Sequence, residues 1–517
     1  MSDFDVIVAG GSHNGLACAS LLAVKGLKVL VLERNPWVGG GAVTQEIVAP
    51  GFKHDLFSSS HIFIHMNPDF NQHLRGELEA NGLKYLWAED KITGHPFDDG
   101  SGVVLYKDVD KTCDSIARHS KADAATYRRI VDEFGEIRDG VIRGVFSPPN
   151  QPSLQAAAME KSPEGMRRLR EFNLSARAFV EEKFESEAIR AMILGWSLAP
   201  HTRPDQEGMG AGFYVMVPSV HHYGQAIPQG GSQQLPLSMM RLIEARGGMV
   251  LTGADIAQFI IADGQCKGVR TVDGTEYLAR HGVVTALDPK QTFLRLIDEK
   301  YLGGDFLRTV SNFKYSDHGI SRIHLALNEQ PRFRNEALDG IPFHRFFGSV
   351  DKIRHQFAEV ELGNLPSEPC LIYVNWTLRD PSRAPEGKHT LSLDTVVPSK
   401  LRSGERWDDV KEAFGETMLD EVRKHVVNLD AGNIIGSVVH TPEDLFRYNR
   451  SFVNGCPTGG ERTLAQWGAF RPFAGYSQYK SPIRRLYMTG PHCHPGNGIS
   501  AMGTIAANVI LRDVGAA

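Results

Sequence analysis

The chain is poor in cysteine and contains no long apolar run. Its six cysteines are spread over 517 residues without a Cys-x-x-Cys pair. Disulfide frameworks and zinc sites bring cysteines together at short spacings, so we expect neither, and a reducing, cytoplasmic compartment is favoured. No stretch of eighteen apolar residues is present, which excludes a membrane-spanning helix. Asp3 and Asp5 occupy the place of a basic signal-peptide region, so we expect no signal peptide. Peripheral contact with a membrane stays open.

The chain also has no excess of positive charge. Its 56 lysines and arginines face 61 aspartates and glutamates, and the basic residues form no tract. Proteins that hold nucleic acid carry a basic patch, so we do not expect a nucleic-acid partner. The length and the ordinary balance of apolar and charged residues indicate a globular protein of roughly two to four domains.

The opening stretch FDVIVAGGSHNGLACASLLAVKGLKVLVLER has the layout of a dinucleotide-binding βαβ unit. A buried strand around 6–8 precedes a turn at Gly10, and Gly15 lets the following helix pack closely. A second strand over 28–32 ends at Glu33, about twenty residues beyond the turn, where a carboxylate can bind ribose hydroxyls. The free amides at the helix N-terminus would bind a pyrophosphate.

Ser12 departs from this pattern, because glycine is usual at the middle position of G-x-G-x-x-G. Its hydroxyl could turn towards a phosphate oxygen and offset the crowding. The next segment, ERNPWVGGGAVT, places a glycine pair, Gly39-Gly40, shortly after Glu33. Such glycines bring backbone amides beside a diphosphate in flavoproteins of the glutathione-reductase type, whereas nicotinamide enzymes do not need them.

The C-terminal stretch SPIRRLYMTGPHCHPGNGISAMGTIAANVILRD predicts a similar unit. A short strand over 486–488 leads to a turn at Thr489-Gly490. The tight loop 494–498 then precedes a helix of small residues, whose N-terminus would again receive an anionic or carbonyl group. We expect the two ends of the chain to lie side by side around one long cofactor.

Taken together, these segments resemble the FAD-dependent phytoene-desaturase-like (carotenoid oxidoreductase-like) family. Further matching segments are PQGGSQQLPLSMMRLIEARGGMVL, DPSRAPEGKHTLSLDTVVP and WGAFRPFAGYSQYKSPIRRLY. The resemblance implies an α/β fold: a Rossmann-type, glutathione-reductase-like FAD-binding domain with an inserted α+β substrate domain, which has a mostly antiparallel sheet and a helical cap. The implied FAD-binding residues are Gly10, Gly11, Ser12, Gly15, Glu33, Arg34, Gly39, Gly40, Gly41, Ala42, Ile256, Gly490, Gly498 and Ile499. The family often has arginine where Gly41 stands.

The resemblance implies that FAD dehydrogenates a hydrophobic or aromatic small molecule by hydride transfer to flavin N5, and that oxygen or a quinone then takes the electrons. No motif decides whether FAD is attached covalently, and we expect non-covalent binding. Other interpretations stay open: a flavin amine or alcohol oxidase, a flavin-dependent isomerase, or a non-catalytic FAD-binding protein. His61, His65 and His494 are candidate acid–base residues, because imidazole titrates near neutral pH. Each could equally be structural. No metal-ligand motif is present, and the oligomeric state is open.

We divide the chain into alternating segments. The FAD-binding domain is assigned to 1–106, 225–298 and 441–517, and the substrate and cap domain to 107–224 and 299–440. The proline-rich stretch 147–153 is expected to be a linker or the entry to the cap. The pattern over 167–198 is helical with a core-facing apolar side. Strands with turns at Asp263-Gly264 and Asp273-Gly274 are expected over 249–284, and an antiparallel sheet over 319–397.

Overall fold

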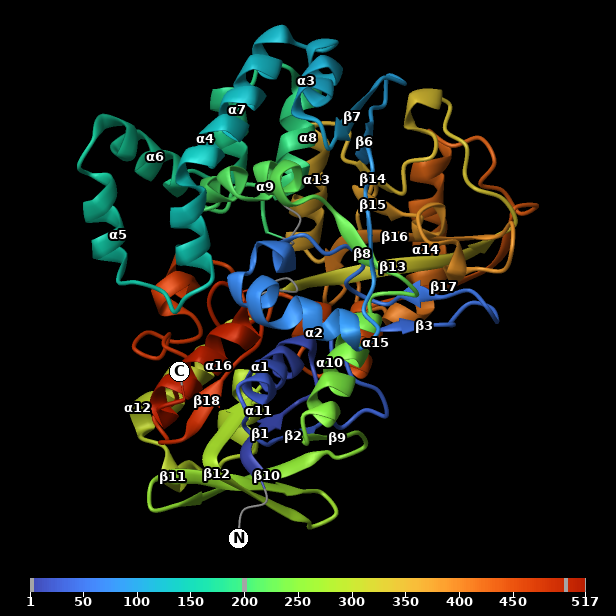
Figure 1. The fold of residues 1–517 in the computed structure, drawn as a ribbon. Helices are drawn as coiled ribbons and strands as arrows, with labels where there is room; N and C mark the ends of the chain where they lie inside the picture. Colours follow the sequence, from blue (N-terminus) through green and yellow to red (C-terminus); the bar gives the residue numbers. More distant parts are fainter. Residues whose placement is uncertain (1–3, 198–201, 497–500, 517) are drawn as a thin grey trace.

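The computed structural model describes residues 4–197, 202–496 and 501–516 (Figure 1). Two seven-stranded sheets and a group of helices make up most of the molecule. In the first sheet, the order β10-β11-β12-β1-β2-β9 places β1 between β12 and β2, and β18 pairs with β12. The strands are β1 (Phe4–Ala9), β2 (Val29–Leu32), β9 (Met249–Leu251), β10 (Ile256–Ala262), β11 (Gln265–Thr271), β12 (Glu276–Thr285) and β18 (Leu486–Met488).

The opening and closing segments of the chain meet in this sheet, as the sequence predicts. Strands β1, β2, β9 and β18 belong to its parallel part, and β10, β11 and β12 form an antiparallel meander. Helix α1 (His13–Val24) lies between α16 (Met502–Val514) and α10 (Gln234–Ala245) (Figure 1). Helices α1 and α16 approach closely because Gly503 has no side chain; a Cβ there would lie 2.3 Å from the Asn14 carbonyl oxygen.

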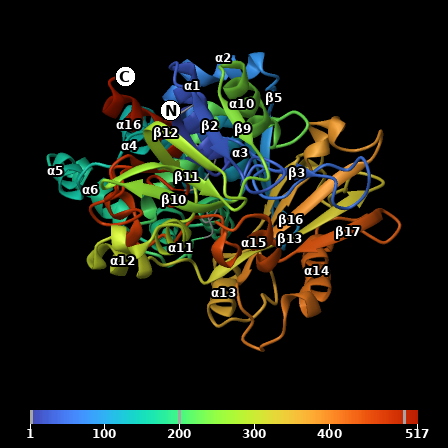
Figure 2. The ribbon, with the colours of Figure 1, turned by 90° about the horizontal axis from the view of Figure 1, so that it is seen from below.

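The second sheet has the strand order β17-β13-β16-β15-β14-β6-β7 and is mostly antiparallel. Every residue of β13 is buried, as expected of a strand covered on both faces. Figure 2 shows this sheet and α14 beside the first sheet. The strands are β6 (Lys91–Pro96), β7 (Gly102–Tyr106), β13 (His318–Leu327), β14 (Phe343–Phe346), β15 (Leu371–Val374), β16 (His389–Pro398) and β17 (Ile434–His440).

Many of the remaining helices form a cap above the first sheet, and several others contact strands of the second (Figure 1). The cap consists of α3 (Val109–Ala117), α4 (Lys121–Val145), α5 (Pro152–Met159), α6 (Pro163–Asn173), α7 (Ala176–Lys183), α8 (Glu187–Ser197) and α9 (Met216–Tyr223). The helices outside the cap are α2 (Arg75–Ala80), α11 (Pro289–Arg295), α12 (Gly304–Ser311), α13 (Val350–Glu361), α14 (Trp407–Arg423) and α15 (Pro442–Tyr448). Two small antiparallel sheets are formed by β3 (Thr44–Gln45) and β4 (His54–Asp55), and by β5 (Tyr85–Trp87) and β8 (Ala226–Pro228). No helix among the described residues is both long and apolar enough to cross a bilayer.

The predicted fold class is confirmed and the stretch 167–197 is mostly helical as expected, but one segment assigned to the FAD-binding domain joins the second sheet. Residues 91–106, assigned to the FAD-binding domain, form β6 and β7 and join the second sheet through β14. The helical stretch 167–198 is divided into α6, α7 and α8, because Ser175 caps a new helix and the Asp123 carboxylate binds the amides of Glu185 and Ser186. Its apolar side does face the core, while Leu198 lies outside the described residues. The other domain boundaries stay predictions.

Candidate cofactor and substrate site

A cavity of about 610 Å³ runs from the first sheet to the second. The residues that follow the carboxyl ends of β1, β2, β12 and β18 contribute Gly10, Glu33, Ala286 and Pro491 to its wall. In open α/β sheets, ligands bind outside the carboxyl ends of the strands. The segment 56–63, the loop 449–452 and strands of the second sheet complete the wall. The cavity is therefore placed to hold a long ligand that reaches from one sheet to the other.

The glycine-rich turn is shaped by contacts that leave no room for side chains. A Cβ on Gly15 would lie 2.3 Å from the Gly10 carbonyl oxygen, and one on Gly40 would lie 2.7 Å from the Ser12 Cβ. Ser12 has an ordinary extended backbone and caps α1: its Oγ accepts a hydrogen bond from the Gly15 amide at 3.3 Å. The conformation at this position therefore does not require glycine, and the serine hydroxyl stabilises the helix start.

Backbone donors at this turn stay unpaired. Among the described residues, the amides of Ser12, Gly40 and Gly41 donate to no protein acceptor, although all three residues line the cavity. Unpaired amides beside the positive end of a helix form a binding site for phosphate groups. The place where the family often has arginine is taken up by the Phe452 and His13 rings, which lie 3.2 and 3.6 Å from a Cβ built on Gly41.

Glu33 lies at the end of β2 with its carboxylate held in place. Its Oε2 accepts from the Gly11 amide at 2.8 Å and its Oε1 from the Asn35 amide at 2.9 Å. Burial raises the pKa of Glu33, and these two hydrogen bonds partly oppose the shift. Arg34 and Ile256 line the same end of the cavity. A ribose and its adenine would be bound at this end.

The predicted cofactor-binding residues fall into three groups. Some line the cavity: Gly10, Ser12, Glu33, Arg34, Gly40, Gly41 and Ile256. Others lie behind its wall and shape the turns: Gly11, Gly15, Gly39, Ala42 and Gly490. Gly39 is required by its positive φ and by a Cβ position only 2.2 Å from the Ala42 carbonyl oxygen. Gly498 and Ile499 lie outside the described residues.

Of the three candidate acid–base histidines, only His61 lines the cavity. Its Nδ1 lies 2.9 Å from the Tyr85 Oη and its Nε2 3.0 Å from the Ser232 Oγ, so both ring nitrogens have hydrogen-bond partners. His65 packs against Tyr85 and Trp87, and burial lowers its pKa to about 3. Burial also lowers the pKa of His494, to about 4, and its Nε2 donates to the Gly144 carbonyl oxygen at 2.8 Å. These contacts favour structural roles, and the catalytic roles stay predictions.

The far end of the cavity was not predicted residue by residue. Its wall is formed by α8, α9, β13, β14 and β15 through Trp196, Met216, Ile320, Phe343, Arg345, Ile372 and Val374. The Arg322 and Asp394 side chains, which face each other across β13 and β16, form an ion pair in the same wall. The strand pattern over 319–397 indicated a sheet here, but no short motif marks which of its side chains face the cavity.

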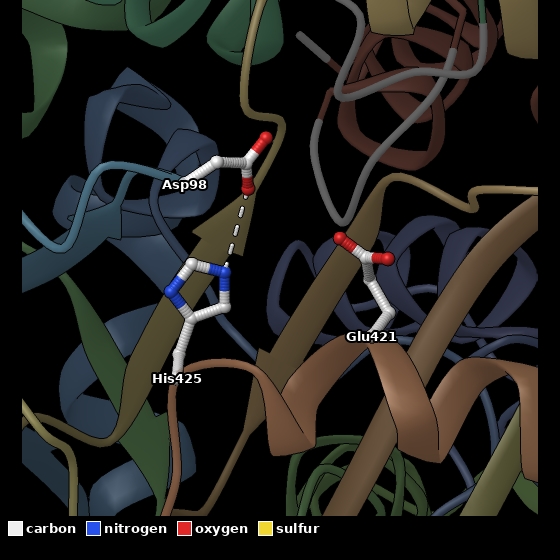
Figure 3. Close-up of side chains that lie close together, drawn as sticks. All are labelled: Asp98, Glu421 and His425. Carbon is white, nitrogen blue, oxygen red and sulfur yellow. Dashed lines mark ion pairs between the residues drawn. The ribbon is translucent and has the colours of Figure 1, made fainter.

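A separate cluster joins Asp98, Glu421 and His425 (Figure 3). Within the part of the chain that the structure describes, it is the one group of acidic and histidine side chains close enough to hold a cation. Glu421 already binds the ammonium groups of Lys352 and Lys424, and His425 lies 3.6 Å from Asp98. The hydrogen bond from His425 lowers the pKa of Asp98. We interpret this cluster as a network of ion pairs.

The comparisons with known proteins define the class. The model of the flavin-containing amine oxidoreductase family matches residues 15–506, and the chain belongs to this family. It is 27% identical to a limonene dehydrogenase component of Castellaniella defragrans, over 99% of this chain and 95% of that protein. It is 26% identical to a phytoene desaturase of Fusarium fujikuroi, over 100% of this chain and 91% of that protein. The structure of cyclohexylamine oxidase from Brevibacterium oxydans matches with a TM-score of 0.62 at 16% identity, over 99% of this chain and all of that chain.

The chain is thus an FAD-dependent oxidoreductase that acts on small molecules, and the resemblance to phytoene desaturases is confirmed. The residues present fit the cofactor. The amides of Ser12, Gly40 and Gly41, which donate to no acceptor in the described part of the chain, suit a diphosphate, and the anchored carboxylate of Glu33 suits a ribose diol.

Proposed function

We propose that the protein dehydrogenates a hydrophobic or aromatic organic molecule, introducing a double bond. Bound FAD supplies the redox chemistry by accepting a hydride from a substrate carbon. The second hydrogen leaves the substrate as a proton. The observation that carries the proposal is the character of the cavity's far end, where Phe343, Ile372 and Val374 line the wall with Trp196. Apolar walls exclude water and bind a carbon skeleton.

The charges in the wall argue against an amine as substrate. Glu33 and Asp255 lie at the ribose end, and Asp394 at the substrate end is already paired with Arg322. The guanidinium of Arg345 faces the same end, and a buried cation repels an ammonium group. This distribution favours oxidation of a C–C unit over the amine oxidase alternative.

The test is anaerobic reduction of the flavin. Purified holoenzyme should lose its visible flavin absorbance when mixed with a substrate from a panel of apolar and aromatic compounds. The product should contain two hydrogens fewer. Turnover without bleaching or net oxidation would instead support an isomerase, and a panel of amines that bleaches the flavin while hydrocarbons do not would contradict the proposal. Mixing the reduced enzyme with oxygen or a soluble quinone then identifies the acceptor.

Replacing Glu33 by alanine should weaken FAD binding. The change removes the acceptor for the ribose and for the Gly11 and Asn35 amides. Hydrogen bonds to charged groups are worth about 1.5–3 kcal/mol, so we expect a Kd for FAD roughly 10- to 100-fold higher. Titration of apoprotein with FAD, followed by flavin fluorescence, measures the change. Glu244→Ala on the exposed face of α10 is the matched control, and an unchanged Kd for Glu33→Ala would refute the ribose assignment.

A further inference from the structure

Arg345 lies at the substrate end of the cavity in an apolar setting. It belongs to β14, an interior strand of the second sheet, and Arg345 is only 5% exposed. The guanidinium carbon lies 4.3 Å from the centre of the Trp196 ring system and 5.2 Å from the centre of the Phe343 ring. Trp196 is itself fixed, because its Nε1 donates to the His95 Nε2 at 3.2 Å. The guanidinium thus lies against two aromatic groups.

Within the described residues, most of the hydrogen-bonding capacity of Arg345 is unused. Nη1 donates to the Gly195 carbonyl oxygen at 3.0 Å, and this is the hydrogen bond that its side chain makes within the described residues. Nε is buried without a partner there, and no carboxylate of the described chain forms an ion pair with the guanidinium. Burial lowers the pKa of Arg345 to about 9, and no neighbouring acid opposes the shift.

Two neighbouring buried arginines, Arg322 and Arg383, have acidic partners. Arg322 forms an ion pair with Asp394 and donates to the Asp55 carbonyl oxygen at 2.9 Å. Arg383 lies between the carboxylates of Asp55 and Asp380, at 2.6 and 3.1 Å. A buried charge without a counter-ion is costly, so proteins normally provide one. Arg471 also lacks an ion pair, but its guanidinium donates to the carbonyl oxygens of Glu461, Gln466, Thr458 and Pro491. Arg345 has neither an acid nor such a set of carbonyl acceptors among the described residues, and it lies at the wall where a substrate must lie.

We propose that Arg345 is the specificity-determining residue of this cavity and binds a carboxylate carried by the substrate. The inference rests on the proposed function and specifies its substrate class: an apolar or aromatic carbon skeleton with one carboxylate. The planar guanidinium suits a carboxylate through paired N–H donors. Ile372, Val374 and Met216 of the same wall then face the apolar part of the molecule. The ion pair fixes which carbons lie against the cofactor.

The test compares carboxylic acids with their methyl esters on the holoenzyme. Octanoate, decanoate and 4-phenylbutyrate are titrated in the calorimeter, each beside its methyl ester, which keeps the skeleton and removes the charge. We expect at least one acid to bind roughly 10- to 100-fold more tightly than its ester. If no acid binds more tightly than its ester, the proposal is overturned, whatever the variants do.

Variants assign the effect to this residue. Arg345→Met should remove the preference for the acid, and Arg345→Lys, which keeps the charge without the planar fork, should retain part of it. Arg308→Met, at an exposed position of α12, is the matched control and should retain the full preference. Full FAD content shows that a variant is folded. An acid preference that survives in folded Arg345→Met would overturn the assignment, and it would show that the ring contacts of Arg345 are structural.

The outcome is separable from that of the proposed function, because binding is measured without turnover. Failure of every compound to bleach the flavin would contradict dehydrogenation while a lost acid preference in Arg345→Met still supported the carboxylate site. Conversely, bleaching by uncharged hydrocarbons together with equal binding of acids and esters would support dehydrogenation and overturn the role of Arg345.

Discussion

Replacement of Gly15 by valine should nearly abolish FAD binding. The new Cβ would lie 2.3 Å from the Gly10 carbonyl oxygen and 3.2 Å from the side chains of Ala286 and Val8. The first of these is a backbone atom, so the turn itself must move away from α1. The amides of the turn would then no longer converge on the diphosphate. Overpacking of this kind costs about 1–3 kcal/mol, and a loss of about 3 kcal/mol in FAD affinity raises the Kd roughly 100-fold.

The measurement is the FAD content of purified protein, together with the Kd from fluorescence titration of the apoprotein. Gly135→Val on α4 is the matched control, because a Cβ at Gly135 meets nothing within 4 Å. Ser12→Ala tests the cap of α1 separately from the shape of the turn. It removes the hydroxyl that accepts from the Gly15 amide, and it should lower the free energy of unfolding by about 1 kcal/mol with little loss of bound FAD. Normal FAD affinity in Gly15→Val would show that the close approach at this turn does not shape the cofactor site.

Asp55→Ala is expected to be the most destabilising single change at the junction of the two sheets. The Asp55 carboxylate accepts from the Thr44 hydroxyl at 2.6 Å, the Ser232 amide at 2.8 Å and the Arg383 guanidinium at 2.6 Å. Asp55 and Arg383 are both almost fully buried. Removing one partner of a buried ion pair leaves donors and a charge uncompensated, so we expect the free energy of unfolding to fall by about 3–5 kcal/mol.

Urea unfolding of the holoenzyme, followed by tryptophan and flavin fluorescence, measures this loss. FAD should also be released at lower urea, because residues 56–63, which directly follow Asp55, line the cavity. Asp55→Asn keeps an acceptor oxygen without the charge and should lose less stability. The comparison variant Asp305→Ala removes a highly exposed ion pair with Arg308 and should change stability by less than about 1 kcal/mol. Equal effects of Asp55→Ala and Asp305→Ala would contradict the structural role of the buried network.

Local residue patterns predict a cofactor end of the site, and several of the predicted residues line one cavity. Strands β1 and β2, the turn at Gly10 and the acid at Glu33 occur within one continuous segment, and their spacing alone relates the parts. For Ser12, the sequence pattern suggests a hydroxyl that turns towards a phosphate oxygen, whereas in the structure this hydroxyl caps α1. A serine three residues before Gly15, at the start of a helix, is the local signal for this cap.

The histidines show a different limit. His61, His65 and His494 were singled out because imidazole can exchange protons, but sequence does not reveal which nitrogens are already occupied. In the structure, Tyr85 and Ser232 bind both nitrogens of His61, and Gly144, from the cap, binds His494. Partners separated by 24, 171 and 350 positions cannot be paired from a single sequence.

The sequence by itself determined the fold class and the cofactor, because these depend on residues that are neighbours along the chain or at a fixed spacing. The ribose role of Glu33 stays a prediction. Tertiary structure alone decided which strands join which sheet and which side chains face the substrate. Gly94 of β6 pairs with His344 of β14 across 250 positions, and β14, α8 and β13 meet at the cavity wall, where Arg345 has no acid partner among the described residues. Such contacts arise from burial of apolar surface among distant elements, which leaves no short pattern in the chain.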